Sequence, residues 1–100
     1  MKIGITFSVK KDEYNPFVNG LRQHIFFFYD LLELIGHNVI LLNTNTNSLE
    51  NVNLFHYKAA QISDYKKHKF DLVFEMGGEI PYKILGEMKK HLKLVAYGCG

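Results

Sequence analysis

Four short apolar runs limit what this chain of 100 residues can fold into. Each run is rich in aliphatic side chains and alternates little between apolar and polar residues, which is typical of a strand covered on both faces. The four predicted strands are 2–9 (KIGITFSV), 38–42 (NVILL), 70–76 (FDLVFEM) and 92–97 (LKLVAY). Strands of this kind occur mainly in parallel sheets with helices on either side.

The segment between the first two predicted strands has the period of a helix. At about 100° per residue, its apolar side chains form one broad stripe made of Leu21, Ile25, Phe28, Leu32 and Ile35, widened by Phe27, Tyr29, Leu31 and Leu34. His24 projects near this stripe, one turn from the helix start. Gly36 supplies a left-handed residue that ends the helix at low cost. Strand, helix and strand together form the crossover unit of a parallel sheet.

The remaining segments continue the alternation of strands and helices. We expect a surface loop at 43–53, a short strand at 54–57, and helical structure in two pieces at 58–68 with Ser63 as a cap. A further helix begins at Pro81, which suits a first helical position. The sequence therefore predicts an α/β fold: a Rossmann-like, doubly wound, mainly parallel sheet of four or five strands with helices on both faces.

Composition and charge exclude several classes of function. A net charge of +2 is too small to argue for a nucleic-acid partner. The longest apolar run, 25–35, contains Asp30 and Glu33 and is shorter than the roughly 20 residues of a membrane span. The first apolar run lacks a small-residue cleavage site, so it reads as a strand and not as a signal peptide. A lone cysteine, Cys99, fits a reducing compartment, and we expect a cytoplasmic protein without a transmembrane segment.

The length suits one small domain covering residues 1–100. The given sequence stops at 98–100, directly after the last predicted strand, where a strand should pass into another element. We therefore expect this Rossmann-like domain to be the N-terminal half of a longer, two-domain protein.

Ligands of an open parallel sheet bind beyond the carboxyl ends of its strands. This rule selects the segments 8–24, 76–81 and 97–100. Glycines and free backbone N–H groups there favour an anion or hydroxyl oxygens. The candidate substrate-binding residues are Asn19, Gly20, Gly77 and Gly78, and the candidate catalytic residues are His24 and Glu79. His24 could orient or deprotonate a hydroxyl group, because imidazole titrates near neutral pH.

Each candidate also has a purely structural interpretation. Asn19 and Gly20 could form only a turn that leads into the helix. His24 could be a partly buried histidine that donates to a backbone carbonyl. Glu79 could complement the dipole of the following helix. The basic cluster 66–69 could be a solvated face or a phosphate site.

Several familiar signatures are missing from the sequence. The first strand is not followed by G-x-G-x-x-G, and no G-x-x-x-x-G-K-[ST] occurs. The chain has no cysteine pair and no close histidine pair that would suit zinc. We therefore expect no metal site and no cofactor in this chain.

With these residues in place, the sequence resembles the N-terminal domain of a GT-B fold glycosyltransferase. The resemblance rests on MKIGITFSV, Asn19–Gly20, His24 and the segment 36–39 (GHNV), followed by KHKFDLVFEMGGEI at 67–80. The pairing of VNGLRQHIFF with a closing VAYGCG is similar to a bacterial group of glycosyltransferase-like proteins of unknown function.

The resemblance implies a transferase of two facing domains, of which this chain is the acceptor side. A nucleotide-sugar donor would bind mainly to a missing C-terminal domain, so the isolated chain would be inactive. Its partners would be that domain and a carbohydrate or glycoconjugate acceptor. The Gly20 turn would approach the donor phosphates or the acceptor, His24 would line the cleft, and 77–79 would lie beside the acceptor. Asn19 and Glu79 depart from the family pattern, which leaves the identity of a base open.

Two alternatives remain open at this point. The chain could be a stand-alone flavodoxin-like or receiver-like module that binds a partner or a small phosphate ligand. The segment FDLVFEMGGEIP at 70–81 resembles a receiver domain, although the first strand lacks the acidic pair that a Mg²⁺ site would need. The chain could also be an inert truncation product.

Overall fold

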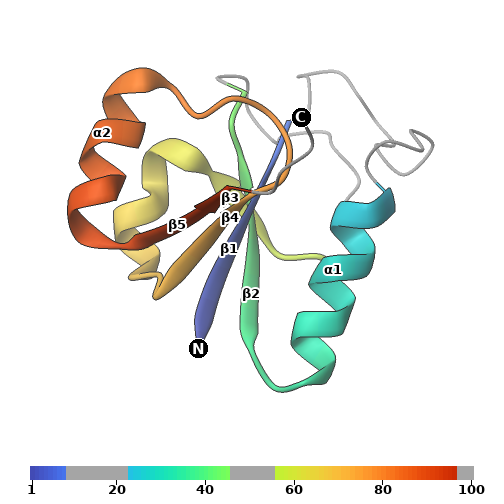
Figure 1. Ribbon diagram of the computed structural model, residues 1–100. Coiled ribbons are helices and arrows are strands. Elements are labelled where there is room, and N and C mark those ends of the chain that lie inside the picture. The colour runs from blue at the N-terminus through green and yellow to red at the C-terminus, as the bar shows by residue number, and fades with distance from the viewer. Residues whose placement is uncertain (9–22, 46–55, 97–100) are drawn as a thin grey trace.

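The protein forms one sheet of five parallel strands in the computed structural model, which describes residues 1–8, 23–45 and 56–96 (Figure 1). The strands are β1 (Lys2–Phe7), β2 (Asn38–Asn43), β3 (Ala59–Gln61), β4 (Leu72–Glu75) and β5 (Lys93–Ala96). Their order in the sheet is β3-β2-β1-β4-β5. This order matches the first five strands of the Rossmann order, 3-2-1-4-5-6, and differs from the flavodoxin-like order, in which the third strand lies beside the first.

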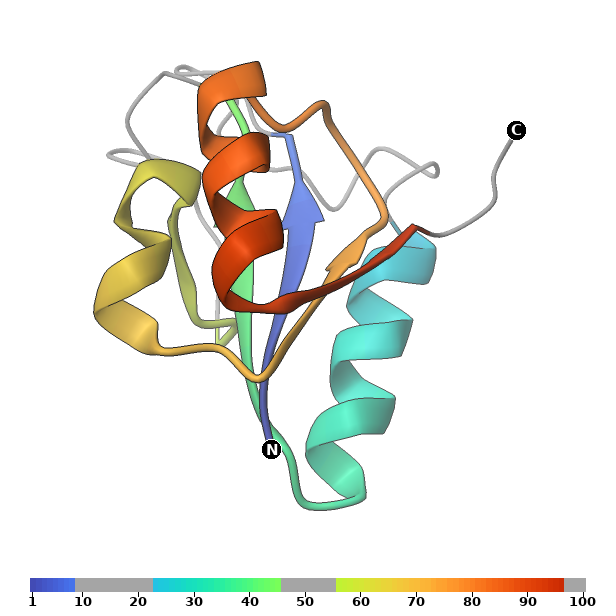
Figure 2. The same ribbon diagram turned by 60° about the vertical axis from the view of Figure 1, so that its left-hand side comes forward.

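Helices cover both faces of the sheet, as the sequence predicts. The long helix α1 (Gln23–Leu34) lies on one face, and α2 (Tyr82–His91) lies on the other beside the 3-10 helix η3 (Ile62–His68) (Figures 1 and 2). The strand pairs are all parallel: β1 pairs with β2 and β4, β2 pairs with β3, and β4 pairs with β5. The predicted α/β class and its doubly wound arrangement are therefore confirmed.

Two apolar layers fill the space between sheet and helices. Under α1, Ile3, Ile5, Phe7, Val39 and Leu41 pack against the helix, and on the other face Ile40, Leu42 and Val73 pack against η3 and α2. Successive residues of β2 thus enter opposite layers, because side chains alternate across a strand. This explains why the strand sequences are continuously apolar.

Gly4 is the small residue that lets the second layer close over β1. A Cβ atom at this position would lie 2.9 Å from Leu42 Cδ1 and 3.1 Å from Val73 Cγ2. Side chains from β2 and β4 therefore occupy the space that a larger residue in the central strand would need.

The buried face of α1 differs from the predicted stripe. Ile25, Phe26, Tyr29 and Leu32 are buried, whereas Phe27, Leu31, Leu34 and Ile35 are exposed. His24 is also exposed and does not lie among the buried side chains. The prediction is confirmed for Ile25, Tyr29 and Leu32 and was wrong for the four exposed residues. The helix α1 carries more apolar residues than one face can bury, so their period alone did not fix the contact face.

The end of α1 agrees with the prediction for Gly36. The φ angle of Gly36 is +100°, in the region that favours glycine. The His37 amide donates to the Leu32 carbonyl over 3.0 Å, and the Gly36 amide donates to the Glu33 carbonyl over 3.0 Å. This pair of bonds is the Schellman ending of a helix.

The region before β4 was predicted less well. The described part of the expected strand 54–57, His56 and Tyr57, is not in a strand; β3 lies two residues later. One helical piece, η3, follows β3 directly, and Ser63 lies inside it while Gln61 occupies the cap position. Pro81 is the cap residue of α2 and not its first helical residue.

Candidate functional site at the carboxyl ends of the strands

Thr6 fastens the loop after β4 to the end of β1. Its side chain is buried, and its Oγ1 accepts the backbone N–H of Met76 at 3.0 Å and of Gly77 at 3.3 Å. The Gly77 amide also donates to the Thr6 carbonyl over 3.1 Å. Further along, Ile80 is buried in the second apolar layer. The loop is therefore fixed on both sides of Gly78 and Glu79.

Thr44 brings the end of β2 to the same place. Its backbone N–H donates to the Phe7 carbonyl over 2.8 Å, and its hydroxyl donates to the same oxygen over 3.2 Å. The preceding Asn43 is fully buried, and its side-chain oxygen accepts the Asn45 amide at 3.1 Å. The chain leaving β2 is thus folded closely over the end of β1.

The two glycines after β4 have no room for side chains. A Cβ atom on Gly78 would lie 1.9 Å from Thr44 Oγ1 and 3.0 Å from Ser8 Cβ, and the φ angle of Gly78 is +71°. A Cβ atom on Gly77 would lie 2.9 Å from Ile25 Cδ1, in the first described turn of α1. The ends of β1, β2 and β4 therefore meet the start of α1 at one rim, which lies at the point where the strand order reverses.

The structure places four of the six candidate site residues. Gly77 and Gly78 lie at the rim, and Glu79 follows them with an exposed side chain. His24 is exposed and directly precedes Ile25, which reaches Gly77. Both candidate catalytic residues therefore belong to backbone segments that meet at the rim. Asn19 and Gly20 lie outside the described residues.

Thr6 and Thr44 are the residues of the rim that sequence reasoning missed. Each is polar and buried at or just beyond the end of an otherwise apolar strand. A buried hydroxyl needs a hydrogen-bond partner, so a threonine at the end of an apolar strand was a usable signal. Its partners lie far away in the sequence and could not be named.

The first described turn of α1 contains no acidic residue. Among the described residues, no group of three or more His, Cys, Asp or Glu side chains is arranged to hold a metal ion. No helix in the described ranges is both long and apolar enough to span a bilayer.

Comparison with known proteins gives a family and no activity. No curated protein and no solved structure matches the chain. Residues 3–100 match the model of a family described as a protein of unknown function, DUF2827. Because this match covers nearly the whole sequence, the chain belongs to that family.

Proposed function

We propose that this chain is the acceptor-side domain of a GT-B glycosyltransferase, which transfers a sugar from a nucleotide-sugar donor. The main support is the rim at which the ends of β1, β2 and β4 meet the start of α1, with Gly78 packed onto Thr44. A rim of this kind, at the reversal of strand order, is where open α/β sheets bind ligands. We infer the reaction from the sequence resemblance, and we expect the acceptor to bind at the rim.

In this proposal the acceptor sugar lies against the loop 77–79. The exposed Glu79 or His24 takes the proton from the acceptor hydroxyl as its oxygen bonds to the anomeric carbon of the donor. The bond from that carbon to the donor phosphate breaks, and the nucleotide leaves with the electron pair. A C-terminal domain beyond this chain would hold the nucleotide, so the isolated domain would bind the acceptor without turnover. The single Cys99 favours the cytoplasm as the compartment.

The strand order favours this proposal over a flavodoxin-like or receiver-like module. In those folds the third strand lies beside the first, whereas β1 here lies between β2 and β4, and β3 is at the edge. The resemblance implies a transferase of two Rossmann-like domains, and this sheet has the Rossmann order.

The test uses the full-length natural protein with a panel of nucleotide-sugar donors and simple sugar acceptors. The measurement is acceptor-dependent release of the nucleotide. Loss of a general base lowers the rate about 100- to 10,000-fold, so Glu79→Gln or His24→Ala should show such a loss. Glu33→Gln is the matched control, because Glu33 is exposed near the far end of α1. If no donor turns over, the proposal of transfer fails. If both variants keep full activity, only the assignment of the base fails.

A further inference from the structure

A pocket lies at the end of the sheet opposite to the rim. It has a volume of about 450 Å³ and is lined by Tyr65, Lys66, Lys69, Phe70, His91 and Leu92. Phe70 and Leu92 come just before β4 and β5, so the pocket is at the amino ends of these strands. It is therefore separate from the site proposed for the acceptor.

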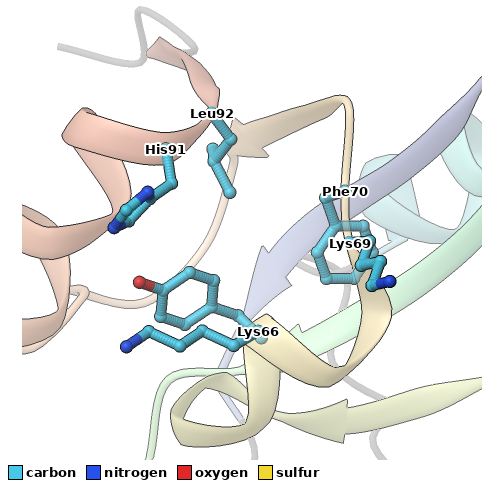
Figure 3. A pocket seen from close by; sticks show the side chains of 6 residues that line it. Lys66, Lys69, Phe70, His91 and Leu92 are labelled. Carbon is cyan, nitrogen blue, oxygen red and sulfur yellow. The ribbon is translucent and has the colours of Figure 1, made fainter.

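The pocket has a basic lining. Figure 3 shows Lys66 from η3 and His91 from the end of α2 on one side, with Lys69 on the other side next to Phe70. The Lys2 ammonium adds a further cation, 5.9 Å from the centroid of the Phe70 ring. The nearby Lys67, Lys89, Lys90 and Lys93 are all exposed. One carboxylate, that of Glu87, forms an ion pair with Lys66.

Basic residues at the ends of helices often only complement the helix dipole. That explanation covers the last turns of η3 and α2, which hold Lys66, Lys67, Lys89 and Lys90. It does not explain why Lys66 lines a cavity together with Lys69 and His91. It also does not explain the unpaired hydroxyl of Tyr65 or the left-handed backbone of Lys69.

Tyr65 presents an unused donor in this pocket. The residue is only 4% exposed, and among the described residues its buried hydroxyl has no hydrogen-bond partner. Burial raises the pKa of Tyr65, so its phenol stays protonated and keeps its donor hydrogen near neutral pH. Leaving such a group unpaired is unfavourable. Lys66 and His91, which line the same pocket, are exposed.

Lys69 has a backbone conformation that suits other residues better. Its φ and ψ angles are 51° and 57°, which is the left-handed region, and it follows the last residue of η3. Glycine or asparagine occupies such a position at lower cost. A lysine there adds a cation that glycine could not provide. Figure 3 shows its side chain extending away from Lys66 and His91, so the ammonium group must turn inward to reach a ligand in the pocket.

We propose that this pocket binds a small phosphate-bearing ligand, whose oxygens accept hydrogen bonds from Tyr65, Lys66 and Lys69. Lysine recognises phosphate as a compact point charge. Phe70 and Leu92 supply an apolar surface for the uncharged part of the ligand. Glu87 competes with the ligand for Lys66, so it limits the affinity. This inference does not depend on the proposed sugar transfer, because it concerns the opposite end of the sheet.

The test is a titration of the ¹⁵N-labelled chain with inorganic pyrophosphate at low ionic strength, followed by NMR. Saturable shifts should centre on residues 65–70 and 91–92. Lys69→Gly removes the cation while it relieves the left-handed backbone, so it should weaken binding about tenfold without lowering the melting temperature. Lys67→Gln is the matched control. It removes an equal charge two residues away, in the last turn of η3, but Lys67 pairs with Asp64 and does not line the pocket. The affinity of the Lys67→Gln variant for pyrophosphate should stay within about twofold of that of the parent.

Two further measurements complete the test. Glu87→Gln frees Lys66 and should tighten binding of pyrophosphate. A parallel titration with AMP identifies the source of the phosphate: tighter binding of AMP indicates a nucleotide, and tighter binding of pyrophosphate indicates an inorganic anion. Equal weakening by Lys69→Gly and Lys67→Gln, or shifts that do not saturate, would overturn the proposal in favour of a solvated basic face. Displacement of pyrophosphate by RNA at much lower concentration would overturn it in favour of a nucleic-acid surface.

Discussion

Replacing Gly78 by alanine tests the packing on which the rim depends. The new Cβ atom would lie 1.9 Å from Thr44 Oγ1, so the Thr44 hydroxyl must move and give up its 3.2 Å hydrogen bond to the Phe7 carbonyl. The backbone also disfavours alanine, because φ is +71°. The left-handed conformation costs about 1 to 2 kcal/mol, and the lost hydrogen bond adds about 1 kcal/mol.

We therefore expect Gly78→Ala to lower the free energy of unfolding by about 2 to 3 kcal/mol. This corresponds to a fall of roughly 10 to 20 °C in melting temperature for a domain of this size. Gly36→Ala is the matched control, since φ there is +100° but a Cβ atom would meet nothing within 4 Å. Gly36→Ala should lower the free energy of unfolding only by the cost of the left-handed backbone, about 1 to 2 kcal/mol.

A double-mutant cycle separates the contact from the backbone strain. Thr44→Ala removes Oγ1 and leaves the Thr44 Cβ position 3.1 Å from the new methyl group, a contact that a small shift relieves. The double variant Thr44→Ala, Gly78→Ala should therefore lose less free energy of unfolding than the sum of the losses of the two single variants. The difference should be about 1 kcal/mol. The assay is urea unfolding followed by circular dichroism, with equal m values required. Additive costs, or a Gly78→Ala cost no larger than that of Gly36→Ala, would refute the described packing.

Four further substitutions, in three experiments, test other parts of the molecule. Gly86→Ala should stabilise the chain by about 0.5 to 1 kcal/mol, because Gly86 lies within α2 and a Cβ atom there meets nothing within 4 Å; a melting temperature that falls would contradict this. Leu34→Gln should change stability by less than about 0.5 kcal/mol, whereas Leu32→Ala should cost about 2 to 5 kcal/mol, since these side chains are 82% and 8% exposed; similar costs would contradict the buried face of α1. Burial and the hydrogen bond to Asp30 raise the pKa of Tyr57 from 10.0 to about 12, so its contribution to stability is complete below pH 10 and is lost as the pH rises towards 12. Tyr57→Phe should therefore flatten the loss of stability over that range, and an unchanged pH profile would show that the Tyr57 hydroxyl has no part in it.

The apolar runs were sufficient to predict the sheet. Strands covered on both faces need a parallel arrangement with helices on each side, and the structure has that arrangement. The short β3 could not be found in the same way. Its sequence, AAQ, is poor in the residues that favour strands, and it becomes a strand because Leu41 and Leu42 pair with Ala59 and Ala60. Tertiary pairing therefore overrode local preference.

The candidate site was predictable only in part. Gly77 and Gly78 could be recognised because glycines that follow an apolar strand are visible in the sequence. The contact of Gly78 with Thr44 joins two loops that are distant in the chain, so the sequence around either residue does not predict it. The exposed position of His24 was missed for another reason: it depends on which face of α1 meets the sheet, and the surplus of apolar residues concealed that face.

The central position of β1 has a consequence for how the chain matures during translation. The strand leaves the ribosome before both of its neighbours, and Lys2 meets its partner Asp71 across a separation of 69 positions. At about 5 to 20 residues per second, the ribosome needs roughly 3 to 14 seconds to make that intervening stretch. During this interval Ile3, Ile5 and Phe7 have no complete sheet to join, so the nascent polypeptide must rely on chaperones or on transient collapse to keep them from aggregating.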